Sequence, residues 1–244
     1  MIHEIATCCS YISNDYLLMC LAVLFYIFSK KAEHAHLVIL LLFAMVYKAC
    51  LKELLKIPAP VTSPTKYGFP SGHINFATMF FGWFIVTYKS KLLYWLCPMA
   101  FALASWSTIY LGYHDILDVL LTPLLPVCAL IIHTLYLRQA SLNKLILVFI
   151  ITSLICQIIS FFALEKMPID VIIGSYGILG FGIATLMLSN RLKMLMLFIA
   201  IALLFLALSN DMLRFSQNCI WLLVFGSLPI ISKIRALIRK KFSF

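Results

Sequence analysis

The chain has 244 residues, of which 64% are hydrophobic and only 11% are charged, and its mean hydropathy is +1.04. Soluble domains hold about 45–50% apolar and about 25% charged residues, so this composition excludes a soluble globular protein and predicts an integral membrane protein. The net charge of +10 does not indicate nucleic-acid binding. The basic residues stand in short clusters between apolar runs, as juxtamembrane charges do, and form no basic patch interleaved with aromatic residues.

The N-terminal segment does not have the pattern of a cleaved signal. It carries Glu4 and Asp15 instead of a basic region, and no small-x-small site follows its first apolar stretch. We therefore expect that stretch to remain as the first span. Most of the eight cysteines lie within or beside apolar runs, and no Cys-x-x-Cys or Cys/His metal spacing occurs. The sequence thus predicts neither a disulfide framework nor a metal site.

The apolar runs predict an all-α, polytopic transmembrane bundle of about nine spans, because lipid leaves the backbone no partner outside a helix or closed barrel and these runs lack strand alternation. The predicted spans are 15–29, 37–55, 71–88, 92–111, 115–137, 145–164, 169–189, 192–209 and 217–234.

The loop charges predict the orientation. If the N-terminus is outside, most lysines and arginines fall in the inner loops and most acids in the outer ones. The positive-inside rule then gives an N-out, C-in topology. The loop 138–144 is the only predicted boundary between two parts of the chain. It separates residues 1–138, which carry every motif described below, from residues 139–244, which we expect to be additional transmembrane helices.

The segment Pro70-Ser71-Gly72-His73 is predicted to begin a helix at the outer face. Ser71 is a good N-cap, and Gly72 leaves the backbone N–H groups accessible to a ligand. A helix N-terminus with free N–H groups binds anions, and His73 would stand beside such an anion with a titratable proton. An ordinary helix start with an interfacial histidine is the alternative.

His114 and Asp118 are spaced i, i+4, which places them on one face of a helix. A carboxylate there can accept the imidazole Nδ1–H, fix the tautomer and leave Nε2 free to attack. The neighbouring Asp115 points away from His114 at its i+1 spacing. An interfacial ion pair or a helix cap would give the same pattern. Lys52 joins these groups at the predicted outer face.

Three segments together resemble the signature of the type-2 phosphatidate phosphatase superfamily, whose pattern is Lys-x6-Arg-Pro, Pro-Ser-Gly-His and Ser-Arg-x5-His-x3-Asp. The matching segments cover about residues 40–125 in the same order and spacing, and they are Lys52 to Pro60, Pro70 to His73, and Ser107 to Asp118. The predicted nine-span, N-outside layout further resembles the glucose-6-phosphatase-like and sphingolipid branches of that family.

The resemblance implies a role for each matching residue. His114 would be the nucleophile that forms a phosphohistidine, and Asp118 would orient it. His73 would protonate the leaving oxygen and then deprotonate water or an acceptor alcohol. Lys52, Ser71 and the Gly72 N–H would hold the phosphoryl oxygens, with no metal or cofactor. The substrate would be a lipid phosphate whose tail lies in the bilayer, at a site facing the periplasm, exterior or lumen.

Two positions depart from the family pattern. Ala59 and Thr108 stand where the family places phosphate-binding arginines, and an arginine contributes bidentate hydrogen bonds and about 10³–10⁵ in phosphoryl-transfer rate. Lys56 and Lys66, in the same outer loop, are candidates to replace the lost charge, although each also fits an ordinary solvated lysine. Lys48, near the outer end of the second predicted span, can snorkel beside Tyr47, and a functional role is the alternative.

Three functions therefore stay open. The first is a lipid-phosphate phosphatase acting on the non-cytoplasmic face. The second is a phosphodiester headgroup transferase similar to the sphingomyelin-synthase-like branch, which also keeps the two histidines and the aspartate without that arginine pair. The third is a non-catalytic protein that binds or transports lipid phosphates.

Overall fold

A computed structural model describes residues 1–29, 33–63, 65–139, 141–163, 168–188, 221–231 and 233–234. In these residues every regular element is helical, and the only β-type pairing is an isolated antiparallel bridge between Pro58 and Tyr67. The all-α prediction is confirmed for this part of the chain. The predicted span 192–209 lies outside the described residues.

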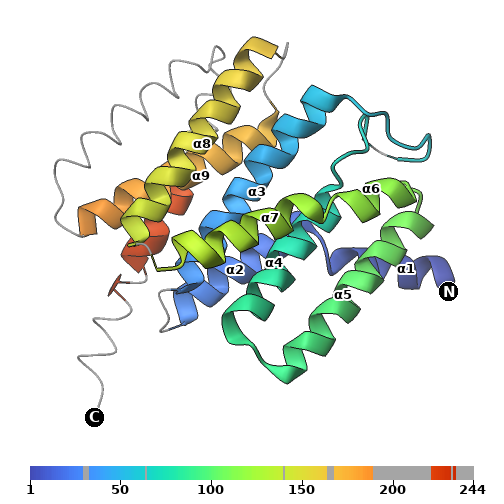
Figure 1. Cartoon of the computed structure of the whole chain (residues 1–244), viewed down its shortest axis with the longest axis horizontal. Helices are drawn as coiled ribbons and strands as arrows, with labels where there is room; N and C mark the ends of the chain where they lie inside the picture. Colours follow the sequence, from blue (N-terminus) through green and yellow to red (C-terminus); the bar gives the residue numbers. More distant parts are fainter. Residues whose placement is uncertain are drawn as a thin grey trace. The chain divides into compact units, whose positions relative to one another are not determined.

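The helices follow one another in the order shown in Figure 1. They are α1 (Ile2–Tyr11), α2 (Asp15–Phe28), α3 (Glu33–Leu55), α4 (Gly72–Tyr88), α5 (Lys91–Tyr110), α6 (Ile116–Leu121), α7 (Leu124–Ile132), the π-helical turn η1 (His133–Leu137), α8 (Leu142–Ala163) and α9 (Ile169–Leu188), followed by a helix over Trp221–Ile231. Helix α1 precedes the first predicted span and was not expected from the sequence.

Three helical stretches in the described residues are long and apolar enough to cross a membrane: Lys91–Tyr110, Ile116–Leu137 and Leu142–Ser160. A fourth is added if α1 and α2, which are bent by 43° at the break between them, form one span. A membrane location agrees with these helices. The count of nine spans and the N-out, C-in orientation remain predictions.

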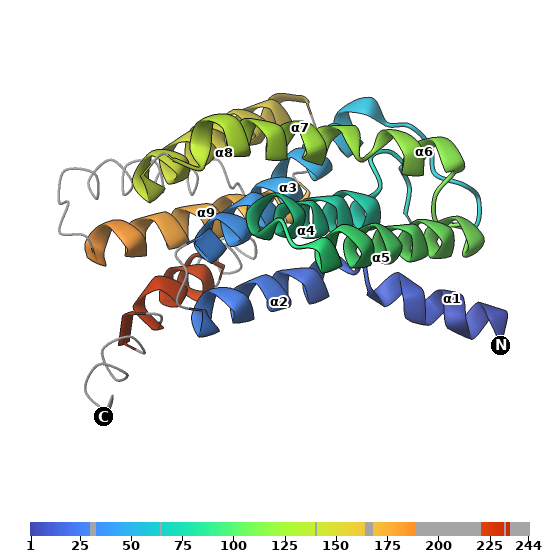
Figure 2. The ribbon, with the colours of Figure 1, turned by 60° about the horizontal axis from the view of Figure 1, so that its bottom comes forward.

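The chain divides into two compact units. The first consists of Met1–Ala22 and Tyr47–Gln139, and the second of Val23–Val46 and Ala140–Phe244. In the first unit α4 packs against α5 and α7, and α1 packs against α5 (Figure 2). All residues singled out by the sequence as candidates for chemistry belong to this first unit.

Local sequence explains how α4 begins and ends. Ser71 has an extended backbone conformation and caps α4, because its side chain accepts a hydrogen bond from the Ile74 N–H at 3.5 Å. At the other end Lys89 adopts the left-handed conformation (φ 47°) and donates its N–H to the Ile85 carbonyl. The predicted helix start at Ser71 is therefore confirmed.

A proline divides the predicted span 115–137. Pro123 separates α6 from α7, because proline has no N–H and its ring disrupts the preceding turn. Thr122, at the end of α6, is fully buried, and its Oγ1 accepts a hydrogen bond from the Ser71 N–H at 2.9 Å. The break thus lies where α6 joins the start of α4.

In the second unit, glycines of α9 allow close helix packing. A Cβ added to Gly174 would lie 2.5 Å from the Leu42 carbonyl oxygen of α3, and one on Gly180 would collide with the Leu222 backbone. Gly226 in turn packs against Gly180. Small residues at such contacts are typical of membrane helices, because they let two backbones approach.

Candidate functional site

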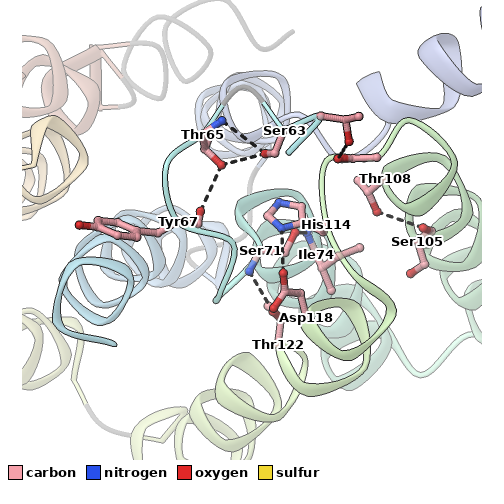
Figure 3. Close-up of polar contacts among 12 residues, drawn as sticks. Ser63, Thr65, Tyr67, Ser71, Ile74, Ser105, Thr108, His114, Asp118 and Thr122 are labelled. Carbon is pink, nitrogen blue, oxygen red and sulfur yellow. Dashed lines mark hydrogen bonds and ion pairs between the residues drawn. The ribbon is translucent and has the colours of Figure 1, made fainter. Parts of the chain in front are cut away.

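Four segments of the first unit meet around His114: the loop 56–70, the start of α4, the turn 111–115 and α6 (Figure 3). Thr62 Oγ1 donates to the Gly112 carbonyl at 2.8 Å and so joins the loop to the turn. Gly112 has φ +69°, and an added Cβ would collide with Thr62. The contact between Ser71 and Thr122 joins α4 to α6 in the same way.

His114 and Asp118 lie side by side, as Figure 3 shows, with the imidazole Nδ1 3.6 Å from the carboxylate Oδ2. The expectation that both stand on one helix is wrong: α6 begins at Ile116 with Asp115 as its N-cap, so His114 lies in the preceding turn. A separation of 3.6 Å is longer than a hydrogen bond, and Nδ1 has no hydrogen-bond partner. Catalytic hydrogen bonds are often long without ligand, so a small shift would complete this one.

The environment of His114 favours its neutral form. The side chain is buried, and burial lowers the pKa of His114 to about 3. The charges of Lys52 and His73 also lower this pKa, whereas a hydrogen bond with the Gly68 backbone and the carboxylate of Asp15 raise it. A neutral imidazole keeps a lone pair on one ring nitrogen, which a nucleophile needs.

Gly68 closes the loop 56–70 over the carboxylate of Asp118. A Cβ added at Gly68 would lie 2.6 Å from Asp118 Oδ2 and 3.2 Å from Ala59 Cα. The Gly68 N–H donates to the Ile57 carbonyl at 2.9 Å, which fixes the loop in this position. A side chain at position 68 would therefore have to displace the Asp118 carboxylate, and position 59 lies next to the site.

The start of α4 brings His73 into the same region. Its ring centroid is 6.2 Å from that of Tyr113, the residue before His114, and its charge acts on His114. The first N–H groups of an α-helix have no acceptor within the helix, so the positive end of α4 adjoins both histidines. No role for Tyr113 is predicted from the sequence, and nothing in its spacing indicates one.

A buried ion pair adjoins this helix start. Lys48 Nζ lies 2.9 Å from Asp15 Oδ2, and Lys48 is only 6% exposed. A Cβ added at Gly72 would lie 3.1 Å from Asp15 Oδ2 and 3.3 Å from Lys48 Nζ. The interpretation of Lys48 as a snorkelling lysine is therefore wrong. Lys48 and Lys52 are spaced i, i+4 on one helix, and this spacing is the sequence signal that places the two lysines on the same helix face.

The other predicted cations differ in their surroundings. Lys52, in the last turn of α3, is half-buried and acts electrostatically on both histidines. Lys56 and Lys66 are exposed; Lys56 follows the end of α3 with φ 50°, and Lys66 Nζ lies 5.0 Å from the Tyr67 ring centroid. The charge of Lys52 acts on both histidines, and the charge of Lys48 acts on His73.

Thr108 does not replace the arginine that the family pattern places there. It is fully buried in α5, and its hydroxyl donates to backbone carbonyls of its own helix, with the Ala104 oxygen at 3.0 Å.

An apolar groove of about 240 Å³ begins one helical turn beyond His73 and is lined by residues of α4 and α5 and by Pro123. Within the described residues no cluster of three or more His, Cys, Asp or Glu side chains could hold a metal.

Comparisons with protein families, with curated proteins and with solved structures give no match. The function is therefore inferred from the residues and geometry of the site itself.

Proposed function

We propose that the protein is a membrane-embedded lipid phosphatase that transfers a phosphoryl group from its substrate to His114 and then to water. The observation that carries this proposal is the buried His114–Asp118 contact beside His73 and the start of α4. A neutral imidazole next to a carboxylate is the arrangement that nucleophilic attack requires. Membership of the type-2 phosphatidate phosphatase superfamily is part of the same proposal.

The first step forms a phosphoenzyme. The imidazole Nε2 of His114 attacks phosphorus and the bond from phosphorus to the substrate oxygen breaks, while Asp118 accepts the Nδ1–H and stabilises the cation that develops. His73 gives its proton to the departing oxygen. A positioned general acid contributes about 10²–10⁴ to such a step.

The second step releases phosphate. His73, now neutral, takes a proton from water as the water oxygen attacks phosphorus, and the bond from phosphorus to His114 breaks. Inorganic phosphate leaves, and both histidines return to their starting forms. Lys52, Ser71 and the Gly72 N–H hold the phosphoryl oxygens in both steps, helped by the positive end of α4.

The apolar character of the chain supports a lipid substrate. The groove between α4 and α5, whose lining begins one turn beyond His73, has the apolar lining that an acyl chain would need. With the N-out, C-in topology and the about nine spans inferred from hydropathy and loop charges, the phosphate would be hydrolysed on the non-cytoplasmic side.

The direct test is phosphate release in detergent micelles from a panel of lipid phosphates, comparing wild type with His114→Ala. His3→Ala is the matched control, because His3 is an exposed histidine of α1. We expect release by the wild type and the control and none by His114→Ala. Release that survives in His114→Ala would contradict the proposal.

Headgroup transfer between lipids is the second candidate. It is favoured by the missing arginines and by the carboxylate of Asp15 beside the start of α4, because a phosphodiester carries one negative charge where a phosphomonoester carries up to two. This alternative requires turnover of a phosphodiester donor that depends on an acceptor alcohol instead of water. If the protein binds lipid phosphate and turns over neither substrate class, the result would favour a non-catalytic binding or transport protein.

A further inference from the structure

The Asp15–Lys48 ion pair is not used by the two steps above. It joins α2 to α3 and lies against Gly72, the first residue of α4. The side chains are 7% exposed for Lys48 and 19% exposed for Asp15. An ammonium group and a carboxylate group therefore both lie beside the first residue of α4.

A buried ion pair is costly unless its remaining polar atoms find partners. Here Asp15 Oδ1 is buried without a hydrogen-bond partner in the described structure. Replacing both residues by apolar ones is often neutral or stabilising in such cases, so stability alone gives weak reason for this pair.

The charged groups that act on His73 also lie around the start of α4. Asp15, Lys48 and Lys52 all act on His73. Lys48 and Lys52 are one turn apart on α3, so their side chains project from one face of that helix. Lys48 is the more buried of the two, and its Nζ lies close to the Gly72 backbone.

We propose that Lys48, held in place by Asp15, binds a phosphoryl oxygen at the start of α4 and takes the part of the arginines absent at positions 59 and 108. This assignment rests on the proposed function and adds a substrate-binding residue to it. Asp15 acts as a positioning residue, because its carboxylate fixes Lys48 Nζ against Gly72.

The test compares Lys48→Met with the neutral pair Asp15→Asn/Lys48→Met. We would measure kcat and KM for phosphate release, the inhibition constant of inorganic phosphate, and thermal unfolding in detergent. Lys48→Met leaves the Asp15 carboxylate buried without its cation, so it loses both stability and phosphate affinity. The neutral pair recovers the stability, but its phosphate affinity stays about tenfold to a hundredfold weaker, which is the loss of one hydrogen bond to a charged group.

Two further variants complete the set. Lys48→Arg keeps the charge and should retain most of the phosphate affinity. Lys91→Met removes an exposed lysine at the start of α5 and should change neither readout. A neutral pair with wild-type phosphate affinity and kcat/KM would overturn the assignment, because the ion pair would then serve the fold alone.

Phosphate-induced stabilisation of the His114→Ala variant separates this inference from the proposed function. If that stabilisation is lost when the neutral pair is added, Lys48 binds phosphate whether or not His114 is a nucleophile. If turnover depends on His114 and the neutral pair leaves phosphate affinity unchanged, only the Lys48 assignment fails. No stabilisation by phosphate in either wild type or His114→Ala would also overturn it.

Discussion

Contacts of two kinds join distant segments in the two units of the chain. In the first unit side chains bond between segments far apart in sequence: Lys48 with Asp15, Tyr47 with Asn75 at 2.5 Å, and Thr122 with the Ser71 backbone. Threonine hydroxyls donate to carbonyls of their own helix in both units, as Thr108 does in α5 and as Thr152 and Thr185 do in α8 and α9. In the second unit close helix contacts form at glycines, such as Gly174 and Gly180.

We therefore expect substitutions in the two units to have different effects on chemistry and on stability. The cross-segment bonds of the first unit hold the histidines, the carboxylates and Lys48 in one place, so a substitution there changes both the fold and the chemistry. In the second unit a substitution at a close helix contact should change stability and leave the chemistry of the folded protein intact. The variants below test that comparison.

Asp118→Asn should have the largest effect. The amide cannot accept the Nδ1–H as a carboxylate does and does not stabilise the imidazolium, and the equivalent change in a serine protease triad lowers kcat by about 10⁴. We expect a loss of about 10³–10⁴ in kcat for phosphate release, with an unfolding temperature close to that of the wild type. Asp115→Asn is the matched control, since Asp115 is exposed. Equal losses in the two variants would contradict the assigned role of Asp118.

His73→Gln should have the second-largest effect, and the size should depend on the leaving group. With a lipid phosphate we expect kcat to fall by about 10²–10⁴, because the departing alkoxide needs a proton. With p-nitrophenyl phosphate, whose leaving group departs without one, the loss should be much smaller. The ratio of the two rates is the measurement. The same loss on both substrates would show that His73 is not the general acid.

Glycine-to-alanine changes provide a matched pair, one in each unit. Gly68→Ala would press against Asp118, and Gly180→Ala would press against Leu222. We expect Gly68→Ala to lower kcat by about tenfold to a hundredfold, because catalysis is sensitive to displacements of about 1 Å. Gly180→Ala should cost about 1–3 kcal/mol of stability with unchanged kcat per folded molecule. Kinetics and thermal unfolding of both variants check this, and a catalytic loss in Gly180→Ala with full stability would break the comparison.

Local patterns in the sequence were enough to place some of the site. The Ser71 cap and the approach of His114 to Asp118 involve residues three or four positions apart, where chain geometry leaves little choice. The break at Pro123 is visible as a residue type, but its use to present Thr122 to Ser71 depends on packing over 51 positions. The pairing of Asp15 with Lys48 spans 33 positions and could not be derived without the fold.

Helix α1 was not predicted from the sequence for a different reason. Its polar residues, such as Glu4 and Thr7, make residues 2–11 too polar for a membrane span, so hydropathy predicts no helix there. In the structure Thr7 Oγ1 donates to the His3 carbonyl within the helix. Ala6 is fully buried, and α1 packs against α5. A short amphipathic helix of this kind is stabilised by tertiary contacts, which hydropathy alone does not reveal.

The most direct test of the central claim is capture of the covalent intermediate. The purified protein would be mixed with a lipid phosphate that it hydrolyses, quenched at alkaline pH, where phosphohistidine survives, and mapped by mass spectrometry. We expect phosphate on His114 in the wild type and in Lys91→Met, and none in His114→Ala. Turnover without any phosphohistidine, or with the phosphate on another residue, would contradict the account.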